Sequence, residues 1–352
     1  LNLNAPANYM VIQTHNPTVE VIGNGDDDGK STTAAITINV IDTTAPVITS
    51  IGIVSSNNTS TTAKTDDTIT LTFTSNEELQ TPNASFFSGG NAITDTPSNS
   101  VSNINNEYNY TFSYTTHSSD TDGDVTFSIP CIDLAGNTTT ITTVPDGSSI
   151  KFDKTNPEAT TLTIVSDNLD NSVANVGNVI TVTLVSNEDL ASLSGTIANA
   201  AVSISGSNQN WTATYTLLNS DNETTTIPFS LTLTDLAGNQ STLDQNNTTD
   251  GSSINFDKTN PDVTSLTIVS DNTDQTKAIV GDTITINLIS NENLLSLSGT
   301  IHGNSATTSG TDNVWSVTYT LVDTDNEIVN IPFSLTLTDL AGNQTTLDQT
   351  NT

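Results

Sequence analysis

An internal repeat constrains this chain more than any other feature. The sequence FDKTNP at residues 152–157 recurs at 256–261, and IPFSLTLTDLAGNQ at 227–240 recurs at 331–344, each at an offset of 104 residues. A diverged copy precedes them, with DTTAP at 42–46 in the place of DKTNP. The chain is therefore a tandem array of one kind of unit.

The repeat predicts three domains, at residues 46–156, 157–260 and 261–352. Residues 1–45 are too few for a further copy. They read as two strands around an acidic GDDDG turn, followed by a linker. We interpret this segment as the C-terminal part of a preceding β domain plus the linker.

Alternation of apolar and polar residues predicts strands within each copy. Ile180, Val182 and Leu184 alternate with threonines, and the same period of two begins again at Trp211 and at Ile227. A period of two is typical of strands with one buried face. About seven short strands in about 100 residues match an immunoglobulin-like sandwich. We predict an all-β fold of tandem immunoglobulin-like β-sandwich domains in an extended row.

The composition limits the partners of the chain. Its 6 Lys and Arg residues stand against 39 Asp and Glu residues, for a formal net charge of −33, which argues against nucleic acid and anionic membranes as partners. One cysteine excludes a disulfide within the chain, so that metal ions are the obvious substitute for stabilising a secreted protein. Because no run of 18 or more apolar residues is present, we expect no membrane insertion of this segment.

The residues TDLAGN, followed by a strand and a D-x-T-x-P linker, resemble the tandem immunoglobulin-like repeats of large bacterial surface adhesins. The resemblance covers about residues 43–352. It implies a repetitive stalk segment on the extracellular surface of a bacterial cell, projecting a distal binding region. The Thr-rich, Asn-rich and Lys-poor composition is similar to that of giant adhesins of gliding motility or biofilm attachment. A surface glycan or protein receptor would bind other parts of the full-length protein, and copies could associate side by side into a filament.

Acidic motifs recur in the predicted loops. In an immunoglobulin-like sandwich the loop between the second and third strands shares one pole with the loop between the sixth and seventh. SNE lies on the first of these loops and DLAGN on the second, so both face the incoming linker and its own aspartate. Calcium accepts about 6 to 8 oxygen ligands in flexible geometry, whereas zinc prefers clusters of Cys and His. The sequence therefore predicts structural calcium at the junctions.

The predicted calcium ligands are the carboxylates Asp153, Glu188 and Asp235 for the second domain, Asp257, Glu292 and Asp339 for the third, and Asp120, Asp122 and Asp124 in the DTDGD segment of the first. The DTDGD segment resembles a calcium loop but lacks the distal glutamate of a full EF-hand loop. The alternative is that Asp and Asn only cap turns, with AGN supplying left-handed residues. Both interpretations remain open from the sequence.

The repeats contain no catalytic pattern. His15, His117 and His302 occupy unrelated positions, and none is paired with a repeating Ser and Asp. A glycosidase would need a carboxylic acid in an apolar pocket, whereas these acids are predicted on solvated loops. We therefore expect no enzyme activity and no catalytic residues.

Two apolar features are predicted to belong to the core. Cys131 aligns with Leu233 and Leu337, so we expect it to be buried and unreactive. Trp211 and Trp315 begin inward-facing stripes and are read as core residues rather than as platforms for sugars.

Two functional hypotheses remain. The near-identity of the second and third copies favours spacers stiffened by calcium, because repeats kept for length need no individual site. The alternative is a binding module for a glycan or a protein in the first copy. There the interval from Glu77 to Asp133 is 56 residues, against 47 in the other two copies, and most of the extra residues lie before Tyr108.

Overall fold

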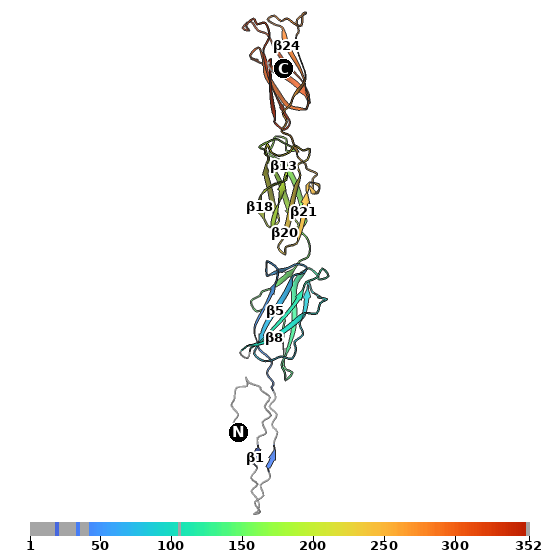
Figure 1. Ribbon diagram of the computed structural model, residues 1–352, viewed down its shortest axis with the longest axis vertical. Coiled ribbons are helices and arrows are strands. Elements are labelled where there is room, and N and C mark those ends of the chain that lie inside the picture. Colours follow the sequence, from blue (N-terminus) through green and yellow to red (C-terminus); the bar gives the residue numbers. More distant parts are fainter. Residues whose placement is uncertain (1–17, 21–32, 36–41, 105–106, 350–352) are drawn as a thin grey trace, which may run out of the picture. The chain divides into compact units, whose positions relative to one another are not determined.

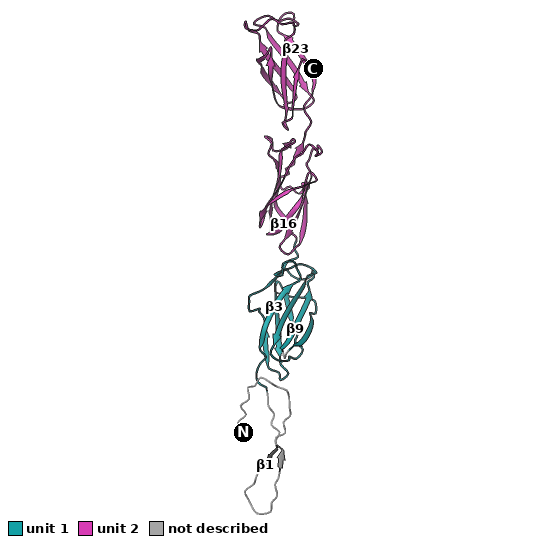
Figure 2. Cartoon of the chain, turned by 60° about the vertical axis from the view of Figure 1, so that its left-hand side comes forward, with its two compact units in different colours: residues 1–155 teal, residues 156–352 magenta. Residues whose placement is uncertain are grey.

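The computed structural model describes residues 18–20, 33–35, 42–104 and 107–349 (Figure 1). Within them the chain consists of β-strands, turns and one short 3-10 helix, η1 (Gln245–Asn247), which confirms the predicted all-β fold. No helix in these ranges has the length and apolar character needed to cross a bilayer. The chain forms two compact units, residues 1–155 and 156–352 (Figure 2).

The segment ahead of the first sandwich contains one described strand pair. Strand β1 (Thr18–Glu20) pairs antiparallel with β2 (Thr33–Ala35). The predicted GDDDG turn and most of the predicted partial domain at 1–45 lie outside the described residues.

The first sandwich, in unit 1, has two sheets. One has the strand order β3-β5-β9-β8, and the other has the order β4-β12-β10-β6-β7, with β11 paired to β10. The strands are β3 (Ile48–Ser55), β4 (Thr62–Ala63), β5 (Thr68–Ser75), β6 (Ser85–Ser88), β7 (Asn91–Ala92), β8 (Ser98–Ile104), β9 (Glu107–Thr115), β10 (Gly123–Ile132), β11 (Thr138–Ile141) and β12 (Ile150–Phe152).

The second sandwich, in unit 2, has sheets of order β13-β15-β19-β18 and β17-β16-β20-β21, and a parallel pair of β14 with β22. The strands are β13 (Ala159–Ser166), β14 (Val173–Ala174), β15 (Val179–Ser186), β16 (Leu190–Ile197), β17 (Ala200–Ala201), β18 (Ser203–Ser207), β19 (Asn210–Thr216), β20 (Phe229–Asp235), β21 (Gln240–Asp244) and β22 (Asn255–Phe256).

The third sandwich, also in unit 2, repeats this plan with the orders β23-β24-β28-β27 and β26-β25-β29-β30. The strands are β23 (Val263–Ser270), β24 (Thr283–Ser290), β25 (Leu294–Ile301), β26 (Asn304–Ser305), β27 (Thr307–Thr311), β28 (Val314–Thr320), β29 (Phe333–Asp339) and β30 (Gln344–Asp348).

Each sandwich has its own hydrophobic core. Along β15 every second side chain is buried, from Ile180 through Val182 to Leu184, which is the period read from the sequence. Tandem immunoglobulin-like sandwiches are thus formed by strands that each bury one face.

Of the residues predicted for the core, Cys131 is buried, whereas the two tryptophans are only partly buried. Cys131 is fully buried in the first core. Trp211 is partly buried against the second core and Trp315 against the third. Gly206 lies opposite Trp211 at a positive φ of 144°, and a Cβ there would lie 2.4 Å from the carbonyl oxygen of Asn210, so glycine allows the indole to cover this edge.

Candidate metal centre

Two groups of three carboxylates lie within single compact units. One group is Asp42, Glu77 and Asp133 in unit 1; the other is Asp257, Glu292 and Asp339 in unit 2. In each group, one carboxylate oxygen of each residue lies within 4.8 Å of one oxygen of each of the other two. The same repeat positions supply both groups: the linker aspartate, the SNE glutamate and the DLAGN aspartate.

The aspartate at the end of β29 is held by its own turn. Asp339 is buried, and its Oδ1 accepts a hydrogen bond from the backbone N–H of Asn343 at 2.8 Å. The Asn343 Nδ2 donates to the other oxygen, Oδ2, at 2.9 Å. Gly342 has a φ of +93°, which lets the chain close this short turn. The turn-capping contacts that the sequence suggested are therefore present at this site.

The linker aspartate is attached to both neighbouring sandwiches. Asp257 directly follows β22, and its backbone N–H donates to the carbonyl oxygen of Ala174 at 2.9 Å in the second sandwich. The carbonyl oxygen of Asp257 accepts from Asn343 Nδ2 of the third sandwich at 3.1 Å. Asn343 thus links the linker to the buried carboxylate of Asp339.

The third carboxylate lies two residues beyond β24. The N–H of Glu292 donates to Ser290 Oγ at 3.3 Å, and its side chain is half-buried. Partial burial, together with the charges of Asp257, Asp339 and Glu223, raises the pKa of Glu292 to about 7. Burial is also the main cause that raises the pKa of Asp257. The group therefore concentrates negative charge where water solvates it poorly.

The group in unit 1 has the same construction. Asp133 Oδ1 accepts from the N–H groups of Ala135 at 2.9 Å and Asn137 at 2.8 Å. Asn137 Nδ2 donates both to Asp133 Oδ2 at 2.8 Å and to the carbonyl oxygen of Asp42 at 3.2 Å. Partial burial, followed by the charges of Asp133 and Asp42, raises the pKa of Glu77.

This first group was not among the predicted ligands. The signal was in the sequence, because DTTAP aligns with DKTNP and so places Asp42 at the repeat position of Asp257. Aligning the first copy with the other two at all three positions would have predicted this group.

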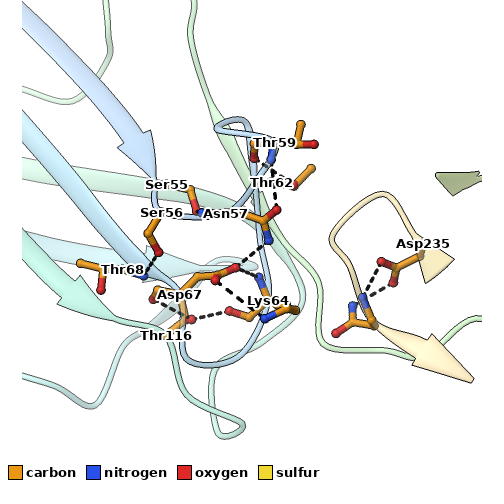
Figure 3. A network of polar contacts seen from close by, with 11 residues as sticks. Ser55, Ser56, Asn57, Thr59, Thr62, Lys64, Asp67, Thr68, Thr116 and Asp235 are labelled. Carbon is orange, nitrogen blue, oxygen red and sulfur yellow. Dashed lines mark hydrogen bonds and ion pairs between the residues drawn. The ribbon is translucent and has the colours of Figure 1, made fainter. Parts of the chain in front are cut away.

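The remaining predicted ligands for the second domain belong to different units. Asp153 directly follows β12 in unit 1. Glu188 and Asp235 belong to unit 2, where their carboxylate oxygens lie within 4.8 Å. Asp235 accepts from the backbone N–H of Asn239 and from its Nδ2, both at 2.8 Å (Figure 3).

The three DTDGD carboxylates do not form a common site. Within the described residues, none of the carboxylate groups that could hold a metal ion contains them. Asp120 is buried and accepts from the N–H of His117 at 2.8 Å. Asp122 accepts from the N–H of Lys154 at 2.8 Å and from Thr155 Oγ1 at 2.7 Å. Asp124 lies within β10. Through Asp122, the segment therefore forms hydrogen bonds with the linker that follows the first sandwich.

A buried carboxylate outside these groups organises the turn after β3 (Figure 3). Asp67 Oδ2 accepts from Asn57 Nδ2 and from the N–H of Lys64, both at 2.7 Å. Thr116 Oγ1 donates to the Lys64 carbonyl oxygen at 2.6 Å. These hydrogen bonds pair the polar atoms of the turn and stabilise its conformation.

The two complete groups fit a divalent cation that prefers oxygen. Calcium binds oxygens at about 2.3–2.6 Å, so two ligands of one ion can be separated by up to about 5 Å. The 4.8 Å limit of each group satisfies this condition. A zinc site would prefer nitrogen and sulfur ligands, and each of these groups offers carboxylates alone.

No protein-family model matches the chain. A search of curated proteins also finds no match. Among solved structures, the chain is similar to an I-band fragment of titin at 8% identity, with 87% of this chain and 98% of that chain covered and a TM-score of 0.39.

It is also similar to the N-terminal eight immunoglobulin domains of the Down Syndrome Cell Adhesion Molecule (15% identity, 92% of this chain and 44% of that chain, TM-score 0.25). A third similar structure is the complex of Dpr2 with DIP-Theta (11% identity, 87% and 98%, TM-score 0.28). The second and third of these structures consist of immunoglobulin domains. The assignment of this fold itself rests on the paired sheets described above.

Proposed function

We propose that this chain is a repetitive stalk segment of a bacterial cell-surface adhesin, with calcium bound at the Asp–Glu–Asp groups. The observation that carries the proposal is recurrence: the same three repeat positions bring carboxylates together in unit 1 and again in unit 2. A capping role explains the buried aspartate of each group. It does not explain why a glutamate and a linker aspartate lie beside it.

The charge of these groups is a second support. Among the described residues, no Lys or His nitrogen forms an ion pair with the carboxylates of either group. Lys258 lies one residue from Asp257, but its Nζ donates to the carbonyl oxygens of Asn219 and Asp221 instead. Burial is the main cause that raises the pKa of Glu292, and a divalent cation would offset the repulsion from neighbouring carboxylates that adds to it.

Calcium in these groups would act on the linkers. An ion shared by the linker aspartate and by two loops of the following sandwich fixes the linker against that sandwich, which limits swivelling. Extracellular calcium fills sites with dissociation constants of about 0.1 to 1 mM, whereas cytosolic calcium leaves them empty. The segment would then be pliable during export and form a stiff, extended row at the cell surface.

The wider role follows from the resemblance of the TDLAGN and D-x-T-x-P motifs to adhesin repeats. The stalk would hold a distal region that binds a surface glycan or protein receptor. The composition favours an adhesin of gliding motility or biofilm attachment, in which neighbouring stalks could associate into a filament.

Small-angle X-ray scattering of the whole chain tests the proposal. We expect the maximum dimension to be larger in millimolar calcium than in chelator. The variant Glu77→Gln/Glu188→Gln/Glu292→Gln should remove this difference while leaving the turn contacts of the aspartates intact. Glu327→Gln, at an exposed loop of the third sandwich, is the matched control. Identical dimensions and melting temperatures with and without calcium would refute the calcium role and favour turn capping alone.

A further inference from the structure

A groove of about 430 Å³ opens in the first sandwich, beside the edge strand β8. One wall is the irregular segment after β5, and the other wall and the floor come from β8 and β9. The lining residues are Glu78, Leu79, Thr81, Pro82, Asn99, Ser100, Val101, Asn103, Tyr108, Tyr110 and Phe112. The volume lies within the range of small-molecule sites, about 300–1,000 Å³.

The floor of the groove is aromatic. Tyr108, Tyr110 and Phe112 alternate along β9 and therefore face the same side of the sheet. Tyr110 and Phe112 are buried, whereas Tyr108 is only half-buried and leaves part of its ring open. The groove thus offers one partly exposed aromatic residue beside two buried ones.

Along β8 the rim of the groove carries neutral polar groups. In the β8–β9 pairing Asn103 lies opposite Tyr108, and Asn99 lies opposite Phe112, so both amides stand on the aromatic side of the sheet. Every residue of β8 is exposed, including Val101 at 60%. The second sheet therefore does not cover this strand, and its amides are free to meet a ligand.

The wall opposite β8 is fixed rather than loose. The N–H of Leu79 donates to Tyr110 Oη at 2.8 Å, and the N–H of Gln80 donates to the Ile132 carbonyl oxygen at 2.8 Å. Gln80 Nε2 donates to the Asp133 carbonyl oxygen at 3.0 Å. A groove held open in this way needs little ordering when a ligand binds.

The chemistry of the lining selects the class of ligand. Among the described residues no Lys or Arg lines the groove, Glu78 is negative, and the chain carries a net charge of −33, so anions are disfavoured. A purely apolar ligand would leave the rim amides without partners. A neutral sugar has an apolar C–H face to lie on Tyr108 and hydroxyl groups for the amides and for Glu78.

We propose that this groove of the first sandwich binds a neutral saccharide unit of a glycan. The site would give the first domain a binding role of its own, separate from the spacer role of the array. It lies in the region where the first copy has its extra residues.

Saturation-transfer NMR on the whole chain in calcium tests this inference. The probes are the neutral disaccharides maltose, cellobiose, lactose and chitobiose at millimolar concentration, with glucuronic acid as the anionic counterpart. We expect saturation transfer to at least one disaccharide and none to glucuronic acid. Tyr108→Ala should weaken binding about tenfold or more, and Asn103→Ala should weaken it as well.

The matched control is Ser102→Ala. Ser102 lies on β8 between two groove positions but is not part of the groove lining, so binding should be unchanged. Protection of Cys131 from a thiol reagent shows that each variant keeps the first sandwich folded. Absence of transfer to all four disaccharides would overturn the inference, as would undiminished transfer in Tyr108→Ala. Neither result depends on the scattering experiment, so the stalk proposal can fail or succeed independently.

Discussion

In the first sandwich Phe112 lies opposite Leu71 in the pairing of β5 with β9, whereas in the second sandwich Ala213 lies opposite Val182 at the equivalent position. Both residues are buried. The first core places Phe73 against Tyr110 with ring centroids 5.0 Å apart, while the second core is mainly aliphatic. The comparison shows that one strand plan accepts cores of different side-chain volume, provided that each core is complementary within itself.

A smaller contrast concerns a buried tyrosine. Tyr215 Oη donates to the Asp221 carboxylate at 3.0 Å, and Tyr319 does the same to Asp325 at 3.1 Å. Tyr114 occupies the same register position in the first sandwich, but among the described residues its buried hydroxyl has no hydrogen-bond partner. Repeat positions can thus keep the residue type and lose the interaction.

The turn after the first strand of each sandwich differs by a single functional group. Asn57 donates to the carboxylate of Asp67, and Asn272 donates to that of Asp282. In the second sandwich the acceptor aspartate is replaced by Asn178. The donor there, Asn168, instead donates to the carbonyl oxygen of Leu340 in the third sandwich at 3.3 Å. Replacing a carboxylate by an amide removes the stronger acceptor, so the donor side chain turns to another partner.

The largest loss of stability is expected when a core residue of the first sandwich is replaced by its counterpart in the second. Phe112→Ala, which introduces the residue of the second sandwich, should lower the unfolding free energy of the first sandwich by about 3–5 kcal/mol, because the aromatic core cannot close the cavity. Denaturant titration followed by labelling of Cys131 measures this sandwich alone.

Trp211 and Trp315 provide the internal control, because their fluorescence reports on the other two sandwiches and should not change. A loss below about 1 kcal/mol would contradict the view that each core is separately complementary.

Calcium should stabilise the sandwiches by the next largest amount. At a free concentration of about 100 times the dissociation constant, each filled group should add about 2.7 kcal/mol to the unfolding free energy. Glu292→Gln should remove the gain seen by tryptophan fluorescence for the third sandwich, and Glu77→Gln the gain seen by Cys131 labelling for the first. Equal gains in wild type and variants would indicate that calcium binds elsewhere.

The tyrosine contrast predicts a smaller difference. Tyr215→Phe and Tyr319→Phe should each cost about 0.5–1.5 kcal/mol, because each removes a hydrogen bond to a carboxylate. Tyr114→Phe should be neutral or stabilising, since its hydroxyl is buried without a partner. Thermal unfolding by calorimetry compares the three variants, and a cost in Tyr114→Phe equal to the other two would contradict the contrast.

The last prediction concerns Cys131, which stands where the other copies have leucine. Burial raises the pKa of this thiol from 9.0 to about 11. The associated stability is fully present below pH about 9 and is lost as the pH rises through about 11, because the unfolded chain then releases the proton first. A thiol reagent at pH 8 should label the native chain far more slowly than the urea-unfolded chain, and comparable rates would show that the thiol is accessible.

Much of the fold was predictable because it follows from local patterns. Alternation at Ile180, Val182 and Leu184 fixes which face of a strand is buried, and the offset of 104 residues carries the same strand to the next copy. Burial of Cys131 followed from its alignment with leucines. The calcium ligands proposed for the third domain come from the same logic, since loops at one pole of a sandwich must lie close together.

The sequence by itself determined the strand period, the number of copies and the acidic motifs that share a pole. Only the tertiary structure decided that Asp122 bonds to Lys154 and Thr155, and that β8 stays uncovered beside an aromatic floor. These features depend on where a linker runs and how far one sheet extends over the other. Such placements result from packing between segments distant in the chain, and a periodic pattern within one strand contains no information about them.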